Sequence, residues 1–296
     1  MKKKRHLIAL DLDGTLLSNN QTVSEETKNV IQQAINDGHI VVIATGRPHR
    51  NSRQYYDFLQ LDTPMINFNG AYIHHPFKNS WERTLHNPFP KSTALNIIDA
   101  CYDLNVQNIL AEVQDTVYLD RHDETIMNIF SSPVTPKGVS PFSIGSVRKQ
   151  LTDDPTSILI YPQAEHVAEL TNHLSDSHAT VIGHRTWDAP WHMVEVIKKG
   201  IHKALGIKQV ADEYQIPRER IIAFGDEDND LEMIDYAGVG VAMGNAIDAL
   251  KDIANYETLT NEEEGVRVFL EEYFNYTAKP NQKSEWIIHP TGNAIE

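Results

Sequence analysis

The sequence has one cysteine, no long apolar run and too few basic residues to balance its acids. Because Cys101 stands alone, an intramolecular disulfide framework and a zinc site built from several cysteines are excluded. No apolar run approaches the ~18 residues that a membrane-spanning helix needs. The 26 Lys and Arg residues against 41 Asp and Glu give a net charge of −15. This balance argues against nucleic acid and anionic membranes as partners, since phosphate contacts need clustered cations.

The start of the sequence is not expected to act as a secretion signal. Residues 1–5 are basic like the first region of a signal peptide, but the apolar run Leu7–Leu10 behind them is broken at once by Asp11. Together with the isolated cysteine, this pattern predicts a cytoplasmic protein.

The sequence does contain a large apolar fraction, arranged as short apolar runs that alternate with helical patterns. With 296 residues and 41% hydrophobic side chains, the chain can fill about two domains. Short apolar runs at 7–10, 40–44 and 65–68 predict buried strands, and the segments 25–37 and 48–59 between them predict helices. Ser24 is the expected N-cap of the first helix. Strands that alternate with helices in this way predict a parallel sheet.

This alternation of strands and helices stops at about residue 81 and resumes near residue 201. The interval is rich in proline, with two helical patterns and several short strands. Beyond it follow a helix at 201–214, a strand at 220–224, a helix at 231–237 and a strand at 239–243. We therefore expect an α/β fold, with a Rossmann-like doubly wound parallel sheet formed by residues 1–82 and 190–276. An α+β domain of residues 83–189 is expected to be inserted into it, and residues 277–296 to form a tail.

Two aspartates follow the first predicted strand directly. Asp11 and Asp13 lie two residues apart, so their carboxylates point to one side of the chain while Leu12 points away. Ligands of open parallel sheets bind at this carboxyl edge. Because two close carboxylates repel each other, the pair needs a divalent cation or a shared proton. Taken alone, Asp-x-Asp-Gly is more typical of a simple turn. Only its position after a buried strand and the other motifs along the chain favour a functional site.

Similar polar groups follow two other predicted strands. Thr45-Gly46-Arg47 offers a hydroxyl and backbone N–H groups for an anion. The run 225–230 brings several carboxylates to one strand end, and such hard oxygen ligands favour magnesium over zinc. An EF-hand is excluded because its ligand spacing is absent. Lys203, at the start of a predicted helix, supplies a cation for an acidic, phosphate-binding edge.

In this order, the four motifs resemble those of the haloacid dehalogenase superfamily. They are Asp11-Leu12-Asp13-Gly14-Thr15, Thr45-Gly46-Arg47, Lys203 and Gly225-Asp226-Glu227-Asp228-Asn229-Asp230. Two flanking stretches, at 69–71 and 237–246, are similar to the Cof-type sugar-phosphatase branch. The resemblance covers about residues 5–82 and 190–274, and the segment between them has no recognisable signature.

The resemblance implies a phosphatase that works through an aspartyl-phosphate. Asp11 is expected to attack phosphorus, and Asp13 to protonate the leaving group and then activate water. Mg²⁺ is expected to be bound by Asp11, the backbone carbonyl of Asp13, and Asp226. Asp230 is expected to support the metal site and Lys203, which is itself assigned to catalysis and phosphate binding. The other expected phosphate-binding residues are Leu12, Thr45, Gly46, Arg47 and Asn229.

The expected substrate is a small phosphate ester, either a sugar phosphate or a phosphorylated cofactor such as flavin mononucleotide or pyridoxal phosphate. Two alternatives stay open at this point: a phospho-aspartate signalling or binding protein without rapid turnover, and a phosphomutase. Asp13 argues against slow turnover, because proteins that keep their aspartyl-phosphate lack an acid there. The insertion after Thr45 argues against the mutase branch, in which the cap domain lies between the first two motifs.

Overall fold

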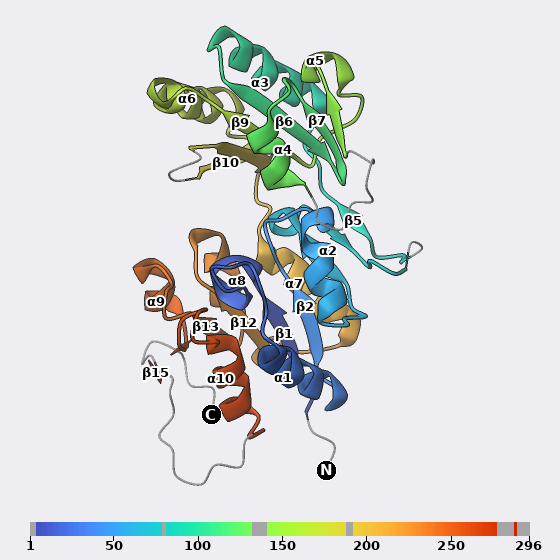
Figure 1. Ribbon diagram of the computed structural model, residues 1–296, viewed down its shortest axis with the longest axis vertical. Helices are drawn as coiled ribbons and strands as arrows, with labels where there is room; N and C mark the ends of the chain where they lie inside the picture. Colours follow the sequence, from blue (N-terminus) through green and yellow to red (C-terminus); the bar gives the residue numbers. More distant parts are fainter. Residues whose placement is uncertain (1–3, 79–80, 132–140, 188–191, 277–286, 289–296) are drawn as a thin grey trace. The chain divides into compact units, whose positions relative to one another are not determined.

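The computed structural model describes residues 4–78, 81–131, 141–187, 192–276 and 287–288. Within them the chain forms two compact units (Figure 1). The first unit contains the residues up to Gly46, Gln54–Arg83 and the residues from His202 onward, and the second contains Arg47–Arg53 and Thr84–Ile201. The chain therefore leaves the first unit and later returns to it. The expected domain boundary at 189–190 and the expected tail, apart from Ile287–Ile288, lie outside the described residues.

A six-stranded sheet forms the centre of the first unit. Its strands follow in the order β15 (Ile287–Ile288), β14 (Tyr256–Glu257), β13 (Val239–Ala242), β12 (Ile221–Gly225), β1 (Leu7–Leu10) and β2 (Ile40–Ile43). Neighbouring strands are parallel from β14 to β2, and β15 pairs antiparallel with β14. The strand predicted at 7–10 has the predicted bounds, those predicted at 40–44 and 239–243 end one residue earlier, and the one predicted at 220–224 is shifted by one residue. Every residue of β1, β2, β12 and β13 is buried, as in a parallel sheet covered on both faces.

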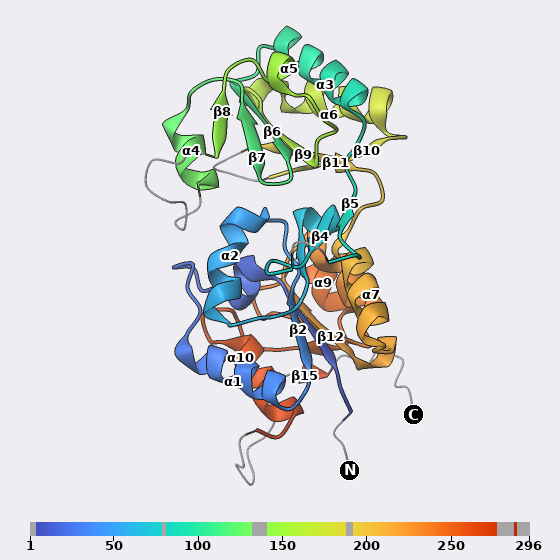
Figure 2. The same cartoon turned by 90° about the vertical axis from the view of Figure 1, so that its right-hand side faces the viewer.

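Helices cover both faces of this sheet, which makes the first unit doubly wound and Rossmann-like. Figure 2 shows α1 (Glu25–Asn36) and α10 (Gly265–Tyr273) on one side and α7 (Lys203–Tyr214) on the other. The first unit also contains α8 (Leu231–Tyr236), which packs on α7, and α9 (Asp248–Ile253). The predicted cap of α1 is confirmed, because the Ser24 side chain accepts a hydrogen bond from the Thr27 N–H. The helix predicted at 48–59 is α2 (His49–Phe58).

The third predicted strand differs from the expectation of a regular parallel partner. β3 (Met65–Asn67) meets the end of β2 through one parallel bridge between Ala44 and Ile66. It pairs antiparallel with β4 (Tyr72–His74). The reason is the turn η2 (Phe68–Gly70), in which Asn69 and Gly70 take positive φ angles of 54° and 98° and reverse the chain after three strand residues.

The second unit is an α+β module around a mixed sheet. Its strand order is β10 (Ile182–Thr186), β11 (Val194–Lys198), β9 (Ser157–Tyr161), β6 (Asn108–Val113), β7 (Thr116–Leu119) and β8 (Phe142–Ile144), and β5 (Leu85–His86) precedes them. One face packs on α3 (Lys91–Asp103), α5 (Val147–Gln150) and α6 (Val167–His178), and the other face packs on α4 (Glu124–Phe130). Sequence patterns had predicted only two helices here, because α4 and α5 have only seven and four residues.

Each unit has its own apolar core. The core of the first unit surrounds its sheet from Leu7 to Leu270, and two smaller clusters fill the second unit. Among the described residues, no helix is both long enough and apolar enough to cross a bilayer.

Candidate active site

The segment after β1 changes direction sharply and separates its side chains by environment. Asp11 is 5% exposed, Leu12 packs fully buried in the core, and Asp13 is exposed. The following residues form one irregular turn, η1 (Leu12–Leu16), in which the backbone of Asp13 is extended and Gly14 has a φ angle of 71°. Leu12 anchors the segment in the core, Asp11 is buried among polar groups, and Asp13 is exposed.

Glycine is required at position 14 because the chain there passes close to Asp226. A Cβ atom on Gly14 would lie 2.0 Å from Asp226 Oδ2, and the positive φ angle would strain any larger residue. The next residue, Thr15, donates a hydrogen bond from its hydroxyl to Asp226 Oδ1 at 2.7 Å. The first and fourth motifs are therefore held together directly, and Asp226 keeps Oδ2 without a donor among the described residues.

Lys203 is the first residue of α7 and is completely buried. Its Nζ donates to Asp11 Oδ1 at 2.7 Å and to Asp230 Oδ1 at 2.6 Å. Burial by itself lowers the pKa of Lys203, but these two carboxylates raise it above its ordinary value. The ammonium thus stays charged and joins the first, third and fourth motifs.

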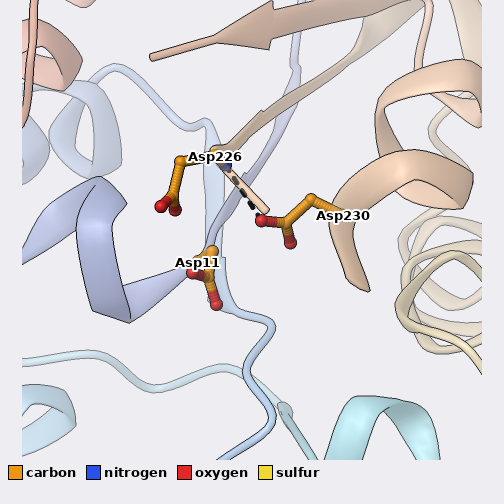
Figure 3. A group of neighbouring side chains, drawn as sticks. All are labelled: Asp11, Asp226 and Asp230. Atoms are coloured by element: carbon orange, nitrogen blue, oxygen red, sulfur yellow. Dashed lines mark hydrogen bonds between the residues drawn. The ribbon is translucent and has the colours of Figure 1, made fainter. Parts of the chain in front are cut away.

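Three buried carboxylates gather around this ammonium. Asp11, Asp226 and Asp230 each place one oxygen within 4.8 Å of the others, and Figure 3 shows them converging from the ends of β1 and β12 and from the turn behind β12. Asp230 is tied on both oxygens, because Oδ1 accepts from Lys203 while Oδ2 accepts the N–H groups of Asp226 and Glu227 at 3.0 and 3.2 Å. Its carboxylate therefore orients the loop and the lysine, although its distance from the other two would also suit a metal ligand.

The carboxylates of Asp11 and Asp226 are costly to ionise in this position. Burial raises the pKa of Asp226 to about 7, with a further contribution from Asp230 and an opposing one from the Thr15 hydrogen bond. Burial also raises the pKa of Asp11 well above its ordinary value, although Lys203 opposes the shift. One ammonium faces three carboxylates, so the fully ionised cluster carries two negative charges in excess.

This donor set fits a divalent cation with a preference for oxygen ligands. Asp11 Oδ2 and Asp226 Oδ2 accept no hydrogen bond within the part of the chain that the structure describes. Carboxylate oxygens are the ligands that Mg²⁺ prefers. A divalent cation would also balance the excess charge and favour the ionised carboxylates, which burial alone disfavours.

The second motif lies beside a residue that the sequence reasoning did not assign to the site. Thr45 is buried directly after β2, and its carbonyl accepts the Asn69 N–H at 3.1 Å. A Cβ atom on Gly46 would lie 3.2 Å from Asn69 Oδ1. The same Oδ1 accepts a hydrogen bond from Asn229 Nδ2 at 3.1 Å. Asn69 thus joins the second and fourth motifs, and its only sequence signal was an Asn-Gly turn after a strand.

Two further asparagines hold the segment after Asp13. Asn245 Nδ2 donates to the Gly14 carbonyl at 2.8 Å, and Asn245 Oδ1 accepts the Asn261 N–H at 2.9 Å. Asn261 Nδ2 in turn donates to the Leu17 carbonyl at 2.9 Å. We call these two residues, Asn245 and Asn261, the asparagine clamp. Like Thr15, they were absent from the predicted site, because the sequence does not show which distant backbone groups these side chains contact.

The structure brings most of the predicted site residues together in the first unit. Asp11, Asp226, Asp230 and Lys203 are in direct contact or adjacent, and Thr45, Gly46 and Asn229 meet around Asn69. Asp13 lies on the same turn and is exposed. Arg47 belongs to the second unit.

Known proteins resemble this chain over almost its whole length. The family described as haloacid dehalogenase-like hydrolase matches residues 8–270. The 5-amino-6-(5-phospho-D-ribitylamino)uracil phosphatase YitU of Bacillus subtilis is 51% identical over 275 residues, which are 93% of this chain and 100% of that protein. The pyridoxal phosphate phosphatase YbhA of Escherichia coli is 28% identical and covers 89% of this chain and 97% of its own. A haloacid dehalogenase-like hydrolase from Bacteroides thetaiotaomicron has a similar structure, with a TM-score of 0.76, 26% identity and coverage of 92% and 100%.

Proposed function

Since the chain belongs to the haloacid dehalogenase-like hydrolases and is a phosphatase, we propose that its substrate is 5-amino-6-(5-phospho-D-ribitylamino)uracil. The observation that carries this proposal is the 51% identity to a phosphatase of that name over the full length of that relative. The more distant pyridoxal phosphate phosphatase, at 28% identity, makes pyridoxal phosphate the weaker candidate.

In the proposed reaction, Asp11 is the nucleophile. Its carboxylate oxygen forms a bond to phosphorus while the bond from phosphorus to the ester oxygen breaks, and Asp13 gives its proton to the departing alkoxide. Asp13 then takes a proton from the water that attacks phosphorus in the aspartyl-phosphate. Inorganic phosphate leaves, and Asp11 regains its carboxylate. The buried position of Asp11 and the exposed position of Asp13 on one turn support this division of roles.

Mg²⁺ would be held by Asp11 and Asp226 through their oxygens without hydrogen-bond donors, together with the backbone carbonyl of Asp13. When bound, it would neutralise the charge that otherwise keeps an anionic phosphoryl group away from a carboxylate. Asp230 would hold Lys203 and the loop of Asp226 in place, which is supported by its three hydrogen bonds.

The phosphoryl oxygens would be bound by positive and N–H groups around the cluster. Lys203 supplies the buried ammonium, and the ends of β1 and β2 supply backbone N–H groups and a hydroxyl. The residues proposed for this role are Leu12, Thr45, Gly46, Lys203 and Asn229. For Arg47 the role rests on the sequence motif alone. The second unit, with proposed bounds at residues 83–189, is the part of the chain that we expect to select the leaving group.

The decisive experiment measures phosphate release by the purified protein with Mg²⁺ from several esters. The panel contains the ribitylaminouracil phosphate, pyridoxal phosphate, flavin mononucleotide and a set of sugar phosphates. We expect the highest kcat/KM for the ribitylaminouracil phosphate. The Asp11→Asn variant should lose at least about a thousandfold in activity on every ester, because the nucleophile is removed.

Three results would contradict the proposal in different ways. A higher kcat/KM for another ester by the active wild-type protein would reject the substrate and leave the phosphatase mechanism standing. Equal activity of wild type and Asp11→Asn would reject Asp11 as the nucleophile. Movement of the phosphoryl group within a sugar phosphate without release of phosphate would indicate a mutase instead.

A further inference from the structure

The turn of Asn69 and Gly70 lies where three of the four motifs meet. The Asn69 N–H binds the Thr45 carbonyl in the second motif, and Asn69 Oδ1 binds Asn229 in the fourth. A Cβ atom on Gly70 would lie 2.6 Å from the carbonyl oxygen of His202, the residue before Lys203. All of these contacts are made within the first unit. The turn therefore has a fixed position relative to the groups proposed to bind phosphate.

Asn69 is unusual both in its backbone and in its side chain. It adopts a φ angle of 54°, which a residue with a Cβ atom rarely takes and which concentrates at functional positions when other contacts enforce it. Its side chain is only 4% exposed. Buried amide groups are ordinarily hydrogen-bonded throughout.

The oxygen of the Asn69 amide is hydrogen-bonded, and its nitrogen has no acceptor among the described residues. Oδ1 accepts the hydrogen bond from Asn229, while Nδ2 donates to no acceptor among the described residues. The amide lies directly against Gly46, where an added Cβ atom would come within 3.3 Å of Nδ2. Nδ2 thus belongs to a largely buried side chain, has no acceptor among the described residues, and lies beside residues expected to surround the phosphoryl group.

We propose that Asn69 is a further substrate-contacting residue, whose Nδ2 donates a hydrogen bond to an oxygen of the transferring phosphoryl group. This inference rests on the proposed phosphatase function and adds a side-chain donor to the lysine, hydroxyl and backbone groups. A donor that is already oriented by Thr45 and Asn229 needs no reorganisation when negative charge develops on that oxygen.

The test compares variants that keep the protein contacts of Asn69 but change its donor. Asn69→Asp retains an oxygen for Asn229 and the backbone hydrogen bond to Thr45, and it places a carboxylate where the NH₂ group was. Asn69→Gly removes the side chain and takes the positive φ angle without strain, so it should fold even if Asn69→Asp does not. A matched control is Asn255→Asp, because Asn255 Oδ1 accepts the Gly240 N–H at 2.7 Å at the start of β13.

The readouts are binding of orthovanadate, a phosphoryl-group analogue, to the Mg²⁺-loaded protein and kcat/KM for p-nitrophenyl phosphate. We expect Asn69→Asp and Asn69→Gly each to weaken vanadate binding by about tenfold or more, because the lost bond is made to a charged group. The control Asn255→Asp should bind vanadate as wild type does.

Wild-type vanadate affinity in a folded Asn69→Asp or Asn69→Gly protein would overturn the inference. If Asn69 merely held Asn229 and Thr45 in place, Asn69→Asp would bind vanadate as wild type does, because it keeps both contacts, and only Asn69→Gly, which loses the contact with Asn229, would bind vanadate more weakly. These outcomes differ from failure of the proposed function, in which the wild-type protein itself would release no phosphate and bind no vanadate, and the inference would fall with it.

Discussion

At the scale of single residues, the site is governed by the cost of burying charge. Lys203 is fully buried, and an isolated ammonium there would be strongly destabilising. It is retained because Asp11 and Asp230 each accept a hydrogen bond from Nζ. Replacing either partner would leave a buried charge incompletely paired, so this group is sensitive to any single change.

The raised pKa of Asp226 predicts how stability and metal binding depend on pH. Burial raises it from 3.8 to about 7 in the folded protein. Between these values the folded state holds a proton that the unfolded state has lost, so the free energy of unfolding of the metal-free protein falls as pH rises, by at most about 1.4 kcal/mol per pH unit for one proton. A cation needs the ionised carboxylate, so affinity for Mg²⁺ should rise over the same window.

This prediction is checked by thermal unfolding of the chelator-treated protein at several pH values between about 4.5 and 8, with and without added Mg²⁺. The stabilisation by Mg²⁺ should increase with pH for the wild type. Asp226→Asn serves as the control, because it keeps an acceptor for Thr15 but cannot titrate. If wild type and Asp226→Asn showed the same pH dependence, Asp226 would not be the titrating group.

At the scale of elements, the turn after β1 is held by hydrogen bonds to residues that are distant in the sequence. Thr15 is bound to Asp226, and the asparagine clamp binds the carbonyls of Gly14 and Leu17. Asn245 is exposed, so its loss should affect stability only slightly. Its contact is made to the residue directly after Asp13, which makes the position of the proposed general acid depend on the clamp.

Asn245→Ala should therefore impair esters with a poor leaving group more than those with a good one. An alkoxide needs protonation as it leaves, whereas p-nitrophenolate does not. We expect kcat/KM for the best alkyl phosphate of the panel to fall about tenfold more than kcat/KM for p-nitrophenyl phosphate, since a positioned acid contributes roughly a hundredfold or more.

An equal fall for both esters would show that Asn245 acts on stability or on phosphate binding and not on the general acid. Asn255→Ala provides the comparison, because it removes a similar bond from side chain to backbone, at Gly240. Its ratio between the two esters should remain that of the wild type.

At the scale of the whole molecule, chemistry and apolar packing are divided between two units. The acidic cluster, Lys203 and the asparagine clamp all belong to the first unit, and each unit has its own core. The chain passes between the units on either side of Arg47–Arg53 and again after Arg83 and after Ile201. A self-contained core explains how one arrangement of motifs can serve relatives with different named substrates.

Exchange of the second unit should therefore change the preferred ester and leave the chemistry intact. In the experiment, residues 84–201 are replaced by the corresponding segment of the Escherichia coli pyridoxal phosphate phosphatase. The ratio of kcat/KM for pyridoxal phosphate to that for the ribitylaminouracil phosphate should rise at least about tenfold, the range that a few pocket contacts supply. Asp11→Asn in the chimera should still abolish turnover. An active chimera with unchanged preference would place the choice of substrate in the first unit.

Much of the site follows from the sequence because of a property of parallel sheets. The carboxyl ends of adjacent strands meet at one edge, so motifs that follow buried apolar runs are expected to converge there. Asp11 after β1, Thr45 after β2 and Asp226 after β12 follow this rule. The family resemblance, the α/β core and the inserted α+β module were predicted from the same patterns and are confirmed.

The sequence by itself determined the alternation of strands and helices in the first unit and the edge of its sheet at which the reactive groups gather. Only the tertiary structure decided how those groups are connected. Asn229 and Asn69 are 160 residues apart, and Asn245 and Gly14 are 231 apart. Periodicity reports the burial of residues on one helix or strand, and it carries no information about which distant turns come together. For that reason the roles of Thr15, Asn69 and Asn245 emerged only from the folded chain.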